Sequence, residues 1–332
     1  MAIQITILGL GEVGASVGLA LRYQKADLHR VGLDVLKSAE EAALRADAVD
    51  RITHSYAEAV KDAAIVVLSM PTSEREETLN QIAPCLGGDA AVLDSSLNKI
   101  EGIRLSRKYL PKPDQFIGLH PALNRAYLGE SGDAWRSAHE DLFKGGTLFI
   151  APTASTDPEV VELAKDFASL LGAFSAFIDP IELDGLLARS EMLPNLLSTA
   201  AVNAAFNSTG WDDQRKVGGK PFYALTKRTD RGQAGRPTAQ EWLGNRDHLL
   251  QALNETAVVL RIYRDALEAN DAETLSRMID FVHNQRDVYL DQYERAVWRN
   301  ETEVKPEKSS FGDVMGQFFL GGLLSAKREK GA

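Results

Sequence analysis

A glycine-rich turn between an apolar segment and a helix-like segment constrains this fold more than any other feature. Ile3 to Leu8 is a run of mostly apolar, β-branched residues, which predicts a buried strand. Gly9-x-Gly11-x-x-Gly14 follows it, and the nearly uncharged segment from Ala15 to Tyr23 has the apolar spacing of a helix. A strand, a glycine turn and a helix in this order predict a dinucleotide site, with the pyrophosphate at the start of the helix.

Each glycine of this turn has a separate expected role. Gly9 permits the tight turn, Gly11 lets backbone N–H groups approach a pyrophosphate, and Gly14 lets the helix pack closely on the strand. The alternative is an ordinary glycine-rich surface turn, so the flanking strand and helix carry the prediction. The cofactor-binding residues predicted at this turn are Gly9, Gly11, Glu12, Val13 and Gly14.

An acidic residue at the end of a second predicted strand indicates which dinucleotide is bound. This strand runs from Arg30 to Asp34, and Asp34 comes 20 residues after Gly14. A carboxylate there accepts hydrogen bonds from the ribose hydroxyls of NAD and repels the 2′-phosphate of NADP. Lys37 is close enough in sequence to meet a phosphate, which keeps NADP as the alternative. We therefore expect NAD, with NADP less favoured.

Composition and charge exclude several classes of protein. The chain has 332 residues, 44% hydrophobic and 25% charged, so a folded protein with two domains is expected. Its net charge of −10 argues against a nucleic-acid partner. One cysteine excludes an internal disulfide, and no Cys/His cluster has the spacing of a zinc site. With no basic leader and no apolar run of about 18 residues, we expect a cytoplasmic protein.

Strands and helices alternate as far as Ile178, which predicts an α/β domain over residues 1–178 with a doubly wound, mostly parallel sheet. After Asp34, the clearest predicted strands are 64–69, 90–94, 115–119, 147–150 and 173–178. Ligands of such sheets bind beyond the carboxyl ends of the strands. The residues at these ends are therefore expected to line one cleft. Ser69, Pro71 and Asp94 are expected beside the cofactor, and Ser96 and His120 beside the substrate.

From Asp179 onward the pattern is helical, with helices expected at about 180–207, 238–270 and 272–298. The segment 208–236, rich in Gly, Lys and Arg, is expected to connect the first two. Helices this long and apolar need a large partner surface, so residues 179–300 are expected to form a helical substrate and dimerisation domain of a homodimer. Residues 301–332 are expected to be a polar linker and a short apolar helix. That helix, at 311–326, is too short to span a bilayer, and we expect it to dock on a partner subunit rather than a membrane.

His120 is the expected catalytic residue because it follows a strand. Oxidation of a hydroxyl-bearing carbon needs a group that accepts the hydroxyl proton, and a neutral imidazole suits this role near pH 7. Pro121 also restricts the backbone of His120 to an extended conformation. The remaining histidines are expected in helices or helix–strand connections, as surface or core residues, and they are His29, His54, His139, His248 and His283.

The segment around this histidine resembles the prephenate/arogenate dehydrogenase family of tyrosine biosynthesis. Gly118-Leu119-His120-Pro121 stands where the family has GxHPM, and Asp141 to Gly146 and Ala151-Pro152 also match it. The resemblance covers about residues 1–295. It implies a Rossmann domain, a helical dimerisation domain and an NAD-dependent oxidative decarboxylation in which the substrate's 4-hydroxyl group donates a hydrogen bond to His120.

The residues that differ from the family pattern lie mainly in its substrate half. The family's D-V-G-S-V-K reads Asp94 to Lys99 here, with Leu97 in place of the serine and Ser96 one position away as its substitute. The family's S-H-x-P-H reads Ser190 to Asn195, without either histidine and with one residue extra. Its F-R-D-x-T-R ends at Lys227, so lysine or a following arginine replaces a substrate-binding arginine. The resemblance thus implies catalytic roles for His120, Ser96 and Lys99, and binding of a dicarboxylate by Arg125, Ser190, Asn195, Lys227 and Arg228.

The first expected function is conversion of prephenate to 4-hydroxyphenylpyruvate with NAD. Arogenate is the nearest alternative substrate. A dehydrogenase of the same fold acting on another hydroxy acid, and a dinucleotide-binding regulatory protein without turnover, are the further alternatives. Substrate panels separate the enzymatic hypotheses, while the regulatory one predicts NAD binding alone. Inhibition by tyrosine is left open.

Overall fold

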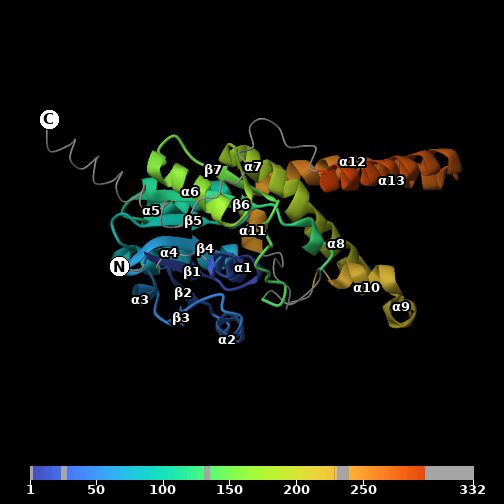
Figure 1. The fold of residues 1–332 in the computed structure, drawn as a ribbon. Coiled ribbons are helices and arrows are strands. Elements are labelled where there is room, and N and C mark those ends of the chain that lie inside the picture. Colours follow the sequence, from blue (N-terminus) through green and yellow to red (C-terminus); the bar gives the residue numbers. More distant parts are fainter. Residues whose placement is uncertain (1–2, 24–27, 131–134, 228, 230–238, 296–332) are drawn as a thin grey trace.

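An eight-stranded sheet forms the centre of the molecule (Figure 1). The computed structural model describes residues 3–23, 28–130, 135–227, 229 and 239–295. The strands are β1 (Ile3–Leu8), β2 (Leu28–Leu33), β3 (Arg51–Ile52), β4 (Ala63–Leu68), β5 (Ala91–Asp94), β6 (Phe116–Pro121), β7 (Thr147–Ala151) and β8 (Phe174–Phe177). Their order across the sheet is β3-β2-β1-β4-β5-β6-β7-β8.

All neighbouring strands are parallel except β6 and β7, which are antiparallel. The expected doubly wound, mostly parallel sheet is therefore confirmed. The exception has a local reason. Parallel neighbours need a crossover connection, usually a helix, that returns the chain to the opposite edge of the sheet. The described part of the segment between β6 and β7 contains a 3₁₀ turn (Arg125–Tyr127) but no α-helix.

Five neighbouring strands of the sheet, β2, β1, β4, β5 and β6, have their carboxyl ends along one edge. Leu8 at the end of β1 pairs with Leu33 of β2 and Leu68 of β4. Leu68 pairs with Asp94 of β5, and Asp94 pairs with Gly118 of β6. The polar residues that follow these strands are thus gathered along one edge, as the sequence predicts.

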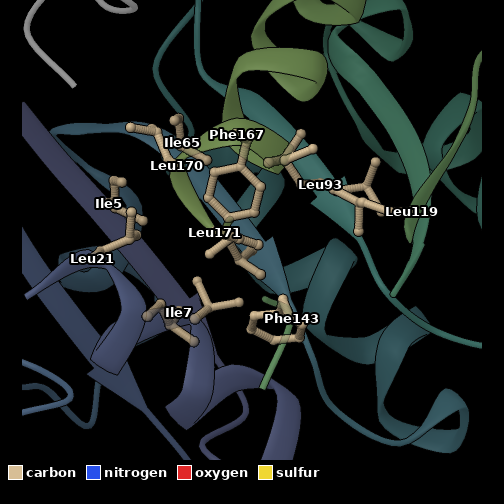
Figure 2. Packing of buried hydrophobic residues seen from close by; sticks show 14 of the residues in the cluster. Ile5, Ile7, Leu21, Ile65, Leu93, Leu119, Phe143, Phe167, Leu170 and Leu171 are labelled. Atoms are coloured by element: carbon tan, nitrogen blue, oxygen red, sulfur yellow. The ribbon is translucent and has the colours of Figure 1, made fainter. Parts of the chain in front are cut away.

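Helices cover both faces of the sheet (Figure 1). They are α1 (Glu12–Leu21), α2 (Lys37–Arg45), α3 (Tyr56–Val60), α4 (Thr72–Ile82), α5 (Lys99–Tyr109) and α6 (Pro158–Leu170). The larger core lies between the sheet and α1 and α6. Figure 2 shows side chains of neighbouring strands packed against these helices and against the loop before β7; among them are Ile5, Ile7, Leu93, Leu119, Leu21, Phe143 and Phe167. Burial of this apolar surface is the main stabilising contribution to the domain.

The second part of the chain is helical. Its elements are α7 (Pro180–Leu187), a π-helical turn (Ala188–Met192), α8 (Leu193–Phe206), α9 (Trp211–Val217), α10 (Lys220–Lys227), α11 (Ala239–Gly244), α12 (Arg246–Glu268) and α13 (Ala272–Arg295). The helices α12 and α13 form a long hairpin that extends away from the sheet, and α9 and α10 lie at the far end of α8 (Figure 1).

Three details of this region differ from the expectation. The helix expected at 180–207 contains the π-helical turn, and the expected connection 208–236 contains α9 and α10. The helix expected at 238–270 is interrupted at Asn245, whose side-chain amide donates to the carbonyl of Asp184 on α7 (2.7 Å). That hydrogen bond lies at the junction between α11 and α12 and ties it to α7. The helix predicted at 311–326 lies outside the described residues.

No helix among the described residues is long and apolar enough to cross a membrane. No group of three or more His, Cys, Asp or Glu side chains in the same part of the chain could hold a metal ion.

Candidate active site

The glycine turn after β1 is closely packed against backbone on two sides. Gly9 has φ +93°, a conformation that side chains disfavour, and a Cβ there would overlap the carbonyl group of Ser69. A Cβ at Gly14 would overlap the carbonyl oxygen of Gly9. The turn therefore needs glycine at both positions. It brings the start of α1 to the end of β1, as the motif predicts.

The N-terminus of α1 has the features of a phosphate-binding helix end. Gly11 occupies the N-cap position, and no side chain caps the first-turn N–H groups. Glu12, Val13 and Gly14 form the first turn, so their amides and the helix dipole suit an anion. Burial raises the pKa of the Glu12 carboxyl group; the Glu130 carboxylate adds to this shift and His139 opposes it. These residues fit the pyrophosphate of a dinucleotide.

Asp34 lies directly after β2, beside the glycine turn. One carboxylate oxygen accepts a hydrogen bond from the amide of Leu10 (2.6 Å), and the other accepts one from the amide of Leu36 (2.7 Å). Each oxygen keeps a second lone pair for a ligand hydroxyl. The structure thus holds this carboxylate where the spacing argument expects the ribose. Ser69 and Pro71 follow β4 at the neighbouring position, and Pro71 precedes α4.

A fully buried ion pair lies behind the end of β5. Nη1 of Arg75, on α4, donates to Asp94 Oδ2 (2.9 Å), to the carbonyl of Asn98 (2.9 Å) and to the hydroxyl of Ser96. Ser96 Oγ in turn donates to Asp94 Oδ2 (2.8 Å). Asp94 and Ser96 are therefore bound within the protein, which differs from the expected cofactor and catalytic contacts. Their place indicates a structural role in fixing the β5–α5 turn.

Sequence reasoning did not identify Arg75, although a signal was present. The buried residues of α4 are Thr72, Arg75, Thr78, Leu79 and Ile82, at helical spacing. Arg75 occupies the core-facing position of this pattern, where an unpaired charge would be costly. A buried position for arginine implies a buried carboxylate nearby. Asp94, 19 residues later, is that partner.

Lys99 begins α5 and is fully buried. Its ammonium group donates to the carbonyl of Leu119 (2.5 Å), to that of Ser96, and over 3.4 Å to that of Asp94. Burial lowers its pKa to about 8, with the Asp94 carboxylate opposing this shift and the Arg75 guanidinium adding to it. Because its donors are directed at backbone, the structure gives Lys99 no direct catalytic contact, in contrast to the role that the resemblance implies.

His120 is half-buried near the end of β6, at the edge that carries the glycine turn. Its Nδ1 atom is buried and has no hydrogen-bond partner among the described residues. Burial lowers the pKa of the imidazole to about 3, and the charge of Lys99 contributes to this shift. The ring is therefore neutral at physiological pH, but a pKa this low makes it a weak base, so it suits acceptance of a hydrogen bond better than the full proton transfer expected from the sequence.

Leu97 replaces the family's serine with an apolar contact. Its side chain packs against a small cluster of Ala151 on β7 and Leu183 and Leu187 on α7. This cluster joins the sheet to the helical region. A serine at position 97 would lose that packing. The two serines of the β5–α5 turn do not replace the family's serine, because Ser95 Oγ donates to the carbonyl of Leu68 and Ser96 is bound by Arg75.

The residues predicted to bind substrate are only partly gathered. Arg125 lies in the 3₁₀ turn after β6, close enough to Tyr293 on α13 to affect its pKa, which burial raises. Ser190 is exposed on the π-helical turn and donates to the carbonyl of Leu186 (3.1 Å). Asn195 lies near the start of α8, and Lys227 is the last residue of α10, a helix that lies at the far end of α8 (Figure 1). Arg228 lies outside the described residues.

Comparison with known proteins identifies the first domain. Residues 17–176 match the family model described as prephenate dehydrogenase, nucleotide-binding domain. The chain is 25% identical over 294 residues to a prephenate dehydrogenase of Bacillus subtilis (strain 168), covering 85% of this chain and 75% of that protein. It is 23% identical over 277 residues to a cyclohexadienyl dehydrogenase of Zymomonas mobilis, covering 82% and 90%.

Solved structures show the same fold over most of the chain. A prephenate dehydrogenase from Aquifex aeolicus, in complex with hydroxyphenyl propionate and NAD+, superposes with a TM-score of 0.74 at 21% identity, covering 87% of this chain and 99% of that one. An arogenate dehydrogenase from Synechocystis superposes with a TM-score of 0.62 at 22% identity, covering 86% and 100%. Together with the sequence matches, these findings show an NAD-dependent dehydrogenase whose residues 17–176 match the nucleotide-binding domain of prephenate dehydrogenases and whose fold is that of solved prephenate and arogenate dehydrogenases.

Proposed function

We propose that this enzyme converts prephenate to 4-hydroxyphenylpyruvate by oxidative decarboxylation with NAD. The observation that carries the proposal is the neutral imidazole of His120 at the sheet edge that also holds the glycine turn and Asp34. The Bacillus subtilis relative named as a prephenate dehydrogenase supports this substrate. Arogenate is the alternative, supported by the fold shared with the Synechocystis arogenate dehydrogenase.

The cofactor is proposed to bind along the glycine turn. The amides of Glu12, Val13 and Gly14 would hold the pyrophosphate, and Asp34 would accept hydrogen bonds from the ribose hydroxyls. The Asp34 carboxylate would also repel the 2′-phosphate of NADP, so NAD is the preferred cofactor. When bound, NAD supplies the acceptor for hydride.

His120 is proposed to accept a hydrogen bond from the 4-hydroxyl group of the substrate. As the hydride leaves C4, positive charge develops on the C4–O unit, and the imidazole stabilises it through this hydrogen bond. The bond from the ring to its carboxylate then breaks, its electron pair completes the aromatic ring, and CO2 leaves. The hydroxyl proton stays on the phenol product, so the step needs an acceptor of hydrogen bonds rather than a strong base. An imidazole with a pKa of about 3 meets that need.

Measurement of NADH formation with prephenate, and separately with arogenate, tests this function. Wild-type protein should form NADH with prephenate, and His120→Asn should lower kcat by about a hundredfold or more while NAD still binds. Because the pKa of His120 is lowered to about 3, its protonation should not reduce kcat between pH 7 and pH 5. An ordinary histidine with a pKa of about 6.5 would lose activity there. Turnover with arogenate alone would favour the alternative substrate. NAD binding without turnover on either would contradict the proposal.

Binding of the substrate carboxylates is proposed to involve Arg125, which follows the strand of His120. Ser190, Asn195, Lys227 and Arg228 remain further candidates from the family resemblance. Because Arg125 lies in the 3₁₀ turn that follows β6, it is the first residue to substitute. Arg125→Met should raise the KM for prephenate more than the KM for NAD.

We also propose that the protein forms a homodimer through its C-terminal helices. The hairpin of α12 and α13 extends from the body of the molecule (Figure 1). Its large apolar side chains are unusually exposed for a surface helix pair; they include Val258, Leu260, Ile262, Leu267, Phe281 and Val282. Many exposed apolar side chains on one helix pair are typical of a protein interface.

A further inference from the structure

A buried lysine joins two strand ends next to the candidate catalytic histidine. We propose that Lys99 is a positioning residue, which fixes the peptide that carries the His120 imidazole and holds a positive charge beside the ring. The activity test of this role rests on the proposed function, because it needs a substrate that the enzyme turns over. Its evidence comes from the hydrogen bonds, packing and charge around Lys99.

The hydrogen bonds of Lys99 link β5 to β6. Its ammonium group donates to the carbonyl of Leu119, the residue directly before His120, over 2.5 Å. It also donates to the carbonyl of Ser96, and over 3.4 Å to that of Asp94, in the turn after β5. An ammonium group has three donors, so these bonds leave none for a substrate. Lys99 therefore acts on the reaction only through the backbone and the electric field.

The stem of Lys99 passes over the strand that carries His120. A Cβ at Gly118 would lie 3.0 Å from Cδ of Lys99 and 3.7 Å from its Cβ and Cγ. A side chain at Gly118 would therefore press on the lysine. Glycine two residues before His120 leaves the space in which the buried lysine reaches Leu119.

The charge of Lys99 acts on His120 and contributes, after burial, to the lowered pKa of the ring. Around Lys99 lie Asp94 from β5, Arg75 from α4 and Asp184 from α7. Asp94 is paired with Arg75, and Asp184 accepts bonds from backbone amides of α5, so neither cancels the ammonium charge completely. With its pKa at about 8, Lys99 stays mostly protonated at pH 7 and opposes protonation of His120.

The backbone next to the His120 ring is held by Lys99. Nδ1 of His120 has no hydrogen-bond partner among the described residues, so no side-chain bond to this atom fixes the imidazole. The Lys99 bond to the adjacent carbonyl holds the peptide instead. A small displacement of that peptide would move the acceptor away from the substrate hydroxyl, and displacements of this kind are costly to catalysis.

The test compares Lys99→Met with Lys108→Met, a matched substitution at the exposed end of the same helix, where lysine forms an ion pair with Glu76 (2.9 Å). Lys99→Met should lower kcat about tenfold or more with the KM for NAD unchanged. The acid limb of its kcat profile should also lie at a higher pH than that of wild type, because His120 without the neighbouring charge is protonated more easily, although burial still opposes its protonation. Lys108→Met should match wild type in both respects.

A second readout does not depend on turnover. Nuclear magnetic resonance titration of the histidine rings, with His120→Asn used to assign the signal, should show no titration of His120 between pH 5 and pH 8 in wild type. In Lys99→Met the same ring should titrate at a higher pH than in wild type, because the opposing charge is removed while burial, the larger cause, still holds its pKa below the ordinary value. If wild-type protein forms no NADH from prephenate or arogenate, the proposed function fails, while this titration still decides the role of Lys99.

Gly118→Ala provides a variant that keeps the charge but displaces the lysine. It should lower kcat several-fold without moving the acid limb of the profile, since the ammonium remains nearby. If Lys99→Met does not fold, this variant decides the positioning role. Wild-type kcat in Gly118→Ala, or a wild-type pH profile and ring titration in Lys99→Met, would overturn the proposal.

Discussion

Individual residues of the glycine turn are constrained by contacts with backbone rather than with flexible side chains. Gly9 has a positive φ and lies against the Ser69 carbonyl, while Gly14 lies against the Gly9 carbonyl. Backbone atoms cannot move aside as the end of a side chain can. The geometry of the dinucleotide site therefore depends on the absence of two Cβ atoms.

A substitution at Gly14 tests this dependence. Gly14→Ala should weaken NAD binding at least tenfold and lower the free energy of unfolding by about 1–3 kcal/mol, because the added methyl group must displace the turn. Gly88→Ala is the matched control, since a Cβ there would meet nothing within 4 Å. Calorimetric NAD titration and denaturant unfolding give both quantities. Equal NAD affinity in the two variants would show that the turn adapts and is not a rigid cradle.

At the scale of elements, the two halves of the chain are joined at the start of α5. Asn98 precedes this helix and is a good capping residue type, but its side chain donates instead to the carbonyl of Glu241 on α11 (3.0 Å). Asp184 on α7 provides the cap, because its carboxylate accepts bonds from the amides of Lys99 (2.7 Å) and Ile100 (3.0 Å). Asn245 then donates to the Asp184 carbonyl. Helical and Rossmann regions are thus held together by buried hydrogen bonds as well as by apolar contact.

Removal of this cap should cost more than removal of a surface carboxylate. Asp184→Ala leaves two first-turn amides of α5, one of them buried, without their acceptor, so the free energy of unfolding should fall by about 1–3 kcal/mol. Asp62→Ala, in the exposed turn before β4, should change it by less than about 0.5 kcal/mol. Urea unfolding followed by circular dichroism measures both. Similar losses in the two variants would mean that the cap adds no stability between the two regions.

For the whole molecule, the exposed hairpin of α12 and α13 is the feature that a single chain does not explain. A helix pair in water normally hides its apolar face, whereas Phe281 is 64% exposed and Val258 is 56% exposed. The body of the protein lies at only one end of the hairpin (Figure 1). A second copy that covers this surface would remove the apolar area from water.

The proposed dimer makes a specific prediction for this hairpin. Wild-type protein at micromolar concentration should sediment as a dimer, and Phe281→Glu should raise the dimer dissociation constant at least tenfold, because a charge would be buried in the interface. Leu44→Glu, an exposed leucine on α2, is the control and should leave the dimer intact. Analytical ultracentrifugation over a concentration series distinguishes the two. A monomeric wild type would contradict the proposal.

The sequence by itself determined the parts that depend on local patterns. Apolar runs, their helical or alternating spacing and the glycine turn predicted the strands, the mostly parallel sheet and the edge at which Gly9, Asp34 and His120 meet. The extra residue noted between Ser190 and Asn195 also has a structural counterpart, because a π-helical turn begins at Ala188 and can accommodate one additional residue. These features arise between neighbours along the chain, so neighbouring residues are enough to predict them.

Only the tertiary structure decided which polar side chains are free to act. Asp94 and Ser96 follow a strand as a site residue would, but Arg75 binds both in the interior. Lys99 resembles a catalytic residue by its register, but its ammonium group is bound to backbone carbonyls, and its amide is capped by Asp184 from 85 residues away. Long-range partners of this kind are chosen by how helices pack on the sheet. Their identity depends on distances that no local pattern contains, which is why burial and partners could be assigned only in the folded chain.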